Sequence, residues 1–142
     1  MAQIPNLKTV DQLRWAYLAD KRNVSNPLVR YDALADLFML LFVPPDRETV
    51  VFYADQAVGL LVDPETMEVV GLQIEAFKRR FLHDHDSLER EWRLSETGID
   101  MQDFGDLLIR FESRKRRVAR EVIRAAESAI GEPAAELVAA LA

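Results

Sequence analysis

The sequence contains no cysteine among its 142 residues. Disulfide bonds, thiolate nucleophiles and zinc or iron–sulfur sites held by cysteine are therefore excluded. Glycine is also scarce, with five in the chain. None of the glycine-rich motifs that bind phosphate groups or present a nucleophilic serine is present. We therefore expect no cofactor and no catalytic residue set of a familiar kind.

Long apolar runs are missing too. The longest, Leu37 to Pro45, is far shorter than the roughly 20 residues that a helix needs to cross a bilayer. The chain does not begin with the basic, apolar and small-residue regions of a signal peptide. These features predict a cytoplasmic protein without a membrane partner. The length favours a single domain over residues 1–142.

The charge is negative overall and unevenly distributed. The net charge is −6. Residues 1–75 contain 6 basic and 11 acidic side chains, whereas residues 76–142 contain 12 and 13. This balance disfavours strong nonspecific binding of nucleic acid, but it leaves a local basic patch open.

Residues 28–75 carry the signals of an antiparallel sheet. Short runs of apolar, β-branched and aromatic residues alternate with turn residues, which predicts a β-meander of four or five strands. Asp63-Pro64-Glu65-Thr66 has the composition of a type I turn. The run Leu37 to Val43 does not alternate with polar residues, which predicts a strand that is covered on both faces.

A helix precedes this predicted sheet. It runs from about Val10 to Lys21 and carries two large aromatic residues, Trp15 and Tyr17. We expect both side chains to pack the helix onto the sheet, and a ligand cage is the alternative function for them.

After the sheet the apolar period becomes helical, over residues 76–142. A helix that ends near residue 95 and a long one from about Met101 to Ile130 would form a helical hairpin. Gly131 and Pro133 mark the start of a short alanine-rich helix, Ala134 to Ala142. Together these elements predict an α+β fold.

The long predicted helix carries a heptad-like seam. Its apolar residues follow a 4-3 spacing that continues beyond what the sheet and the preceding helix can cover. We expect the uncovered part, with the apolar face of the last helix, to form a homodimer interface. The predicted interface residues are Phe104, Leu108, Phe111, Val118, Val122, Leu137 and Leu141.

The segment His83-Asp84-His85-Asp86 contains both histidines of the chain. Imidazoles and carboxylates are ligands for zinc or manganese. On a helix, however, residues two apart point about 200° from each other, so the imidazoles would diverge. We therefore predict structural roles and no metal site.

Four arginines share one side of the long predicted helix, interrupted by Glu121. Such a stripe can follow the phosphates of a nucleic acid, or it can pair with nearby carboxylates. The candidate nucleic-acid face consists of Arg110, Arg114, Arg117 and Arg124.

Aspartates recur near the ends of the predicted strands. Paired carboxylates can do acid–base or metal chemistry, but aspartate also begins turns, which is the role we predict. The aspartates concerned are Asp32, Asp36, Asp55 and Asp63.

Three blocks in residues 29–74 form a pattern: Tyr31-Asp32 with Asp36, then Gly59 to Asp63, then Val69 to Ile74. They resemble a small bacterial β-meander family of unknown function. Its members read roughly Y-D-x3-D-x-L-Y-I, then G-I-V-L-D, a turn and I-V-G-I-E-I. Gln73 stands where that family has glutamate. The resemblance implies a sheet here and brings no catalytic residues.

These features lead to one leading hypothesis and two alternatives. The leading hypothesis is a non-enzymatic interaction protein that self-associates. The first alternative is a nucleic-acid-binding regulator that uses the arginine stripe. The second is a small metal-dependent, hydrolase-like enzyme, which would need a pocket with a histidine and two aspartates. An outward, unpaired stripe would favour the regulator, and an ion-paired stripe would favour the interaction protein.

Overall fold

The computed structural model describes residues 13–96, 99–102, 106–109 and 112–142. Its strands form one seven-stranded sheet, in the order β3-β4-β5-β2-β1-β7-β6. The strands are β1 (Leu28–Asp32), β2 (Leu37–Leu41), β3 (Val50–Tyr53), β4 (Val58–Val62), β5 (Val69–Glu75), β6 (Ile99–Gln102) and β7 (Asp106–Ile109). The helices are α1 (Ala16–Ala19), α2 (Lys21–Val24), the π-helix η2 (Phe77–Phe81), α3 (Asp86–Glu96), α4 (Glu112–Ala125), α5 (Glu127–Ile130) and α6 (Pro133–Ala140).

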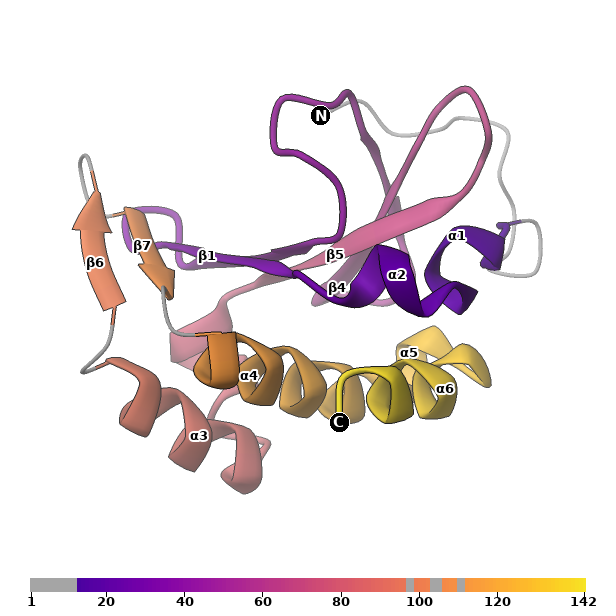
Figure 1. Ribbon diagram of the computed structural model, residues 1–142. Helices are drawn as coiled ribbons and strands as arrows, with labels where there is room; N and C mark the ends of the chain where they lie inside the picture. Colours follow the sequence, from indigo (N-terminus) through magenta and orange to yellow (C-terminus); the bar gives the residue numbers. More distant parts are fainter. Residues whose placement is uncertain (1–12, 97–98, 103–105, 110–111) are drawn as a thin grey trace.

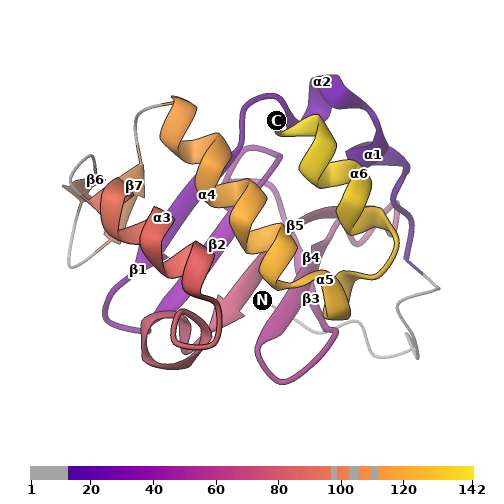
Figure 2. The ribbon, with the colours of Figure 1, turned by 90° about the horizontal axis from the view of Figure 1, so that it is seen from below.

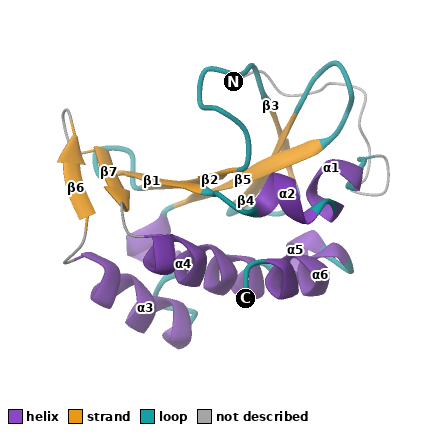
Figure 3. Cartoon of the chain, viewed as in Figure 1, coloured by secondary structure: helices purple, strands orange, loops and turns teal. Residues whose placement is uncertain are grey.

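The predicted α+β class is confirmed. Every strand pair in the sheet is antiparallel, and helices precede and follow the five strands between residues 28 and 75 (Figure 3). The strands β3, β4 and β5 form a meander, and β1 and β2 form a hairpin. The two units join through β2 and β5, so the order is not that of one continuous meander.

Helices cover one face of the sheet. Figures 1 and 2 show α3, α4 and α6 side by side below the strands. Buried aromatic residues fill the space between the layers under β1 and β2. The ring of Phe38 stacks on that of Phe77 at 4.7 Å, and Trp92 lies 5.0 Å from Phe77 and 5.5 Å from Tyr31. The main core therefore lies between the sheet and the C-terminal helices.

The opposite face carries a second, smaller cluster of buried apolar side chains: Leu41, Val43, Val51, Leu61 and Val70. The central strand β2 contributes to both clusters, because Phe38 and Leu40 point into the main core. The prediction that the run Leu37 to Val43 is covered on both faces is confirmed from Leu40 to Val43 and at Phe38, whereas Leu37 and Met39 are half-buried.

The N-terminal helix is shorter than predicted in the part that the structure describes. Two single turns, α1 and α2, replace one continuous helix, because Asp20 has extended backbone (ψ 114°). The Asp20 carboxylate then accepts a hydrogen bond from the Arg22 N–H and caps α2. As expected, Tyr17 packs against the sheet, where its hydroxyl donates to the Phe42 carbonyl oxygen at 3.0 Å.

The residues between Ala76 and α3 differ from the continuous helix that the spacing predicts. Ala76 has a left-handed backbone (φ 51°), and the five residues of η2 follow it. The Asp36 carboxylate accepts hydrogen bonds from the Lys78 and Arg79 N–H groups at 2.8 and 3.1 Å. It also accepts one from the Tyr31 hydroxyl at 2.6 Å. Asp36 therefore joins the β1–β2 turn to η2.

Asp63 holds the turn between β4 and β5 in a similar way. Its side chain is buried and accepts hydrogen bonds from the Glu65 N–H at 2.8 Å and from the Arg47 guanidinium at 2.6 Å. Asp32 and Asp55 likewise accept hydrogen bonds from N–H groups of their own turns. The turn role predicted for these aspartates is confirmed.

The long helix predicted from Met101 to Ile130 is wrong in its first part. Residues 99–102 and 106–109 form β6 and β7, and the helix α4 begins at Glu112. The strand β7 pairs with β1, which has β2 on its other side. When β7 pairs with β1, the N–H and C=O groups along that edge of β1 gain hydrogen-bond partners. This long-range pairing outweighs the preference for a helix that the 4-3 spacing indicates. The two predicted hairpin helices still pack on each other, as α3 and α4.

None of the helices in the described part of the chain combines the length and the apolar composition that a membrane span requires.

The last helix encloses the main core within one chain. Leu137 and Leu141 are 4% and 1% exposed, and α6 contacts α4 as well as α1 and α2. We expect Leu141→Ala to lower the free energy of unfolding by about 2–5 kcal/mol, because it leaves a cavity in this core. Urea unfolding measures the change. Leu34→Ala, at a site 80% exposed, is the control and should stay within about 0.5 kcal/mol. Equal effects would contradict the internal role of α6.

The turn aspartates make stability depend on pH. Hydrogen bonds from the Glu65 N–H and from Arg47 hold the pKa of Asp63 below its usual range. Its stabilisation is therefore present above the unfolded pKa of about 3.9 and is lost as the pH falls through the lower folded pKa.

Asp63→Asn should lower the free energy of unfolding at pH 7 by about 1–3 kcal/mol. The variant should then lose less stability than the wild type between about pH 5 and pH 2. Urea unfolding across this range provides the measurement. Asp46→Asn is the matched control, because Asp46 is exposed in the loop between β2 and β3. A parallel pH profile for Asp63→Asn and the wild type would refute the role of this carboxylate.

Candidate functional site

The two histidines do not come together. His83 is exposed in the turn after η2, whereas His85 is half-buried. The His85 Nδ1 atom lies 2.8 Å from the Phe81 carbonyl oxygen, and its ring is 4.4 Å from the Phe81 ring. Within the residues that the structure describes, no three histidine or acidic side chains are placed to hold a metal ion. His85 therefore packs on Phe81 just before α3 and not within a continuous helix, and His83 lies on the surface, as predicted.

The surface hollows beside the histidines contain too few carboxylates for the hydrolase-like alternative. His85 lines one hollow with Asp86 and Glu121, and His83 lines another with Glu89. Neither combines a histidine with two aspartates. Asp32, Asp55 and Asp63 accept hydrogen bonds from their own turns, and Asp36 accepts them from η2, so these four carboxylates already have partners.

The arginine stripe is partly ion-paired. Arg114 lies 3.4 Å from the Glu91 carboxylate on α3, and Arg124 lies 2.8 Å from Glu121. Arg117 is exposed. Arg110, the fourth predicted member, lies outside the described residues. A stripe that is interrupted by carboxylates attracts phosphates less strongly than a continuous one.

The predicted interface residues are not exposed in a common seam. Val118 and Val122 on α4 are 0% exposed, as they pack under the sheet within one chain. Leu137 and Leu141 are buried in the same core. Leu108 belongs to β7 and pairs with Arg30, whereas Phe104 and Phe111 lie outside the described residues. The interface that the spacing predicts is therefore incorrect for α4 and α6, because folding of a single chain already covers their apolar faces.

The edge strand β6 presents a different surface. It pairs with β7 on one side, and among the described strands it has no partner on the other. In Figures 1 and 2 it lies at one end of the molecule, and no described element lies beyond it. A sheet edge of this kind offers free N–H and C=O groups to another strand.

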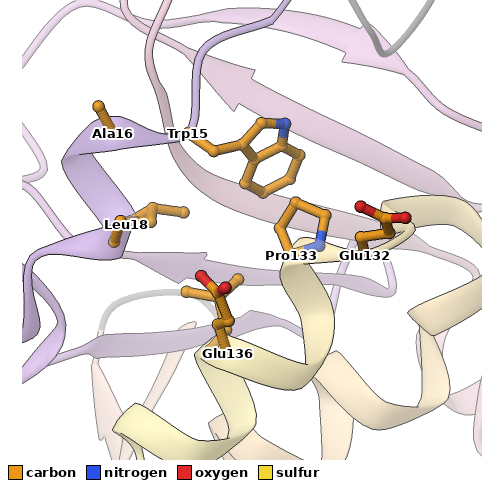
Figure 4. A pocket seen from close by; sticks show the side chains of 8 residues that line it. Trp15, Ala16, Leu18, Glu132, Pro133 and Glu136 are labelled. Atoms are coloured by element: carbon orange, nitrogen blue, oxygen red, sulfur yellow. The ribbon is translucent and has the colours of Figure 1, made fainter.

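A groove lies at the other end of the molecule, between α1 and α6. It has a volume of about 270 Å³. Figure 4 shows the Trp15 indole beside the Pro133 ring, with Leu18 on one side and the carboxylates of Glu132 and Glu136 at the α6 side. Leu18 and Leu137 are both 4% exposed and line the groove from the core. The groove thus combines an apolar lining with two acidic side chains.

The sequence does not reveal this groove as a unit. Glu132 and Glu136 are four residues apart, and Pro133 begins a helix, so a shared face of α6 can be predicted. The sequence predicts that Trp15 packs against the sheet, with a ligand cage as the alternative. No sequence signal places Trp15 against residues more than a hundred positions later in the chain.

Comparisons of this chain with protein-family models, with curated proteins and with solved structures give no match. The resemblance of residues 29–74 to the small bacterial β-meander family remains a prediction.

Proposed function

We propose that this protein is a non-enzymatic interaction module that associates with a second copy of itself through the edge strand β6. The observation that carries the proposal is the open backbone edge of β6 at the end of the sheet. Strands in this sheet pair only in the antiparallel sense, and a second β6 would continue that pattern. Antiparallel pairing of identical strands has twofold symmetry, which gives a closed dimer.

The contacts of the turn aspartates, the histidines and the arginine stripe support an interaction role over a hydrolase-like enzyme or a nucleic-acid-binding regulator. The turn aspartates are engaged by backbone N–H groups, and the histidines are separated. Two arginines of the stripe are paired with glutamates, which favours the interaction protein over the regulator.

The expected association is modest. The strand β6 has four residues, so a pair of them forms only a few backbone hydrogen bonds. Each contributes about 0.5–1.5 kcal/mol net. With contacts from neighbouring side chains, we expect dissociation constants of about 10–100 μM, which correspond to roughly −6 kcal/mol.

The absence of cysteine makes a sharp test possible, because one introduced thiol is unique. Twofold antiparallel pairing places one residue opposite its own copy, because neighbouring pairs in the ladder alternate in hydrogen bonding and cannot be equivalent. For pairing centred on β6 that residue is Asp100 or Met101, so the variants Asp100→Cys and Met101→Cys cover the two registers. We expect one of the two samples to form disulfide-linked dimers rapidly under mild oxidation, because opposite residues in a sheet lie within disulfide reach.

Leu34→Cys is the matched control, since this position is 80% exposed in the β1–β2 turn. It should cross-link only at the slow rate of random collision. Light scattering of the wild type between about 10 and 200 μM should show a rising mass. A constant monomer mass over that range, or equal cross-linking of the control, would refute the proposal.

A further inference from the structure

The groove between α1 and α6 is built from groups that recognise a positively charged side chain. The Trp15 indole is half-buried and lines the groove beside Pro133 (Figure 4). Aromatic faces attract cations, and tryptophan does so most strongly. The carboxylates of Glu132 and Glu136 lie at the same groove. A cation placed there would meet an aromatic face and two negative charges.

Both carboxylates are available. Glu132 and Glu136 are exposed, and no ion pair joins either of them to a described basic residue. Glu132 directly precedes α6 and Glu136 lies in its first turn, and Figure 4 shows their side chains on either side of Pro133, both at the groove. The start of a helix carries a partial positive charge of about half a unit, and two carboxylates more than offset it. The groove is therefore negative as well as apolar.

The size of the groove limits the occupant. A volume of about 270 Å³ lies just below the range of pockets that enclose drug-sized ligands. It suits one long side chain with an apolar stem. Among cations, the arginine guanidinium is planar, stacks on aromatic rings and donates several hydrogen bonds to carboxylates at once. Lysine has a more strongly hydrated point charge and fits this combination less well.

We infer that this groove binds the side chain of an arginine in an extended segment of a partner protein, with the guanidinium against Trp15 and its N–H groups directed at Glu132 and Glu136. The groove and the strand β6 lie at opposite ends of the molecule (Figure 2). Binding of arginine and self-association therefore use separate surfaces, and either can be tested without the other.

The probe is the peptide acetyl-Gly-Leu-Arg-Leu-Gly-amide, titrated into the full chain and followed by two-dimensional NMR. The chain has two tryptophans, and Trp92 is 1% exposed in the core. The indole N–H signal of Trp15 should move to saturation while that of Trp92 stays in place. We expect a dissociation constant of about 0.1–1 mM, as for a single side chain at a partly exposed site. The same peptide with citrulline, which has the shape of arginine without its charge, should bind at least about tenfold more weakly.

The double variant Glu132→Gln with Glu136→Gln should weaken binding of the arginine peptide by about tenfold or more. Glu48→Gln with Asp84→Asn is the matched control, because it removes two exposed negative charges that do not line the groove. This control should bind like the wild type. The amide spectrum of each variant reports whether it is folded.

Three results would overturn the inference. The first is no movement of the Trp15 signal at 5 mM peptide, about five times the weakest expected dissociation constant. The second is equal binding of the arginine and citrulline peptides, which would make the groove merely apolar. The third is equal loss of binding in the groove variant and the control variant, which would reduce the effect to overall charge.

Discussion

The carboxylate of Asp36 is the constraint on which the main core depends. It receives hydrogen bonds from the Tyr31 hydroxyl and from two backbone N–H groups of η2, and so it fixes the β1–β2 turn against the start of the helical half. The backbone N–H of Phe77 also donates to the Asp36 carbonyl oxygen. Phe77 is held in this way beneath Phe38 and beside Trp92. Burial alone would raise the pKa of Asp36, but the hydrogen bonds outweigh it and the pKa is lowered.

This junction has a conformational cost on both sides. Asp36 and Ala76 each have a φ of 51°, a left-handed backbone that alanine in particular adopts only when the surrounding structure requires it. Packing of the aromatic cluster, which joins the sheet to α3, offsets this conformational cost. The helix α3 in turn packs on α4, and α4 on α6. The hydrogen bonds of Asp36 therefore determine where the layer of helices α3, α4 and α6 begins.

The elements that could be predicted from the sequence are those set by local chemistry. Asp63 and Pro64 mark their turn, Gly131 and Pro133 mark the start of α6, and the unbroken apolar run marks β2 as a strand buried on two faces. The strands β6 and β7 could not be predicted, because β7 is stabilised by pairing with β1 far away in the chain. The groove could not be predicted from the sequence either, because Trp15 and Pro133 are far apart in the chain and come together only in the folded protein.

The separation in sequence between the sheet and its cover has a consequence during synthesis. The strands β1 to β5 are complete by Glu75, whereas α4 ends at Ala125, 50 residues later. At about 5–20 residues per second, this interval lasts roughly 3–10 s. For that time the nascent chain carries the apolar side chains of Phe38, Leu60 and Ile74 without the helices that bury them in the finished protein. Transiently exposed apolar surface of this kind favours aggregation, so the order of the elements along the chain creates a brief unprotected stage of synthesis that ends only with the helices that come last.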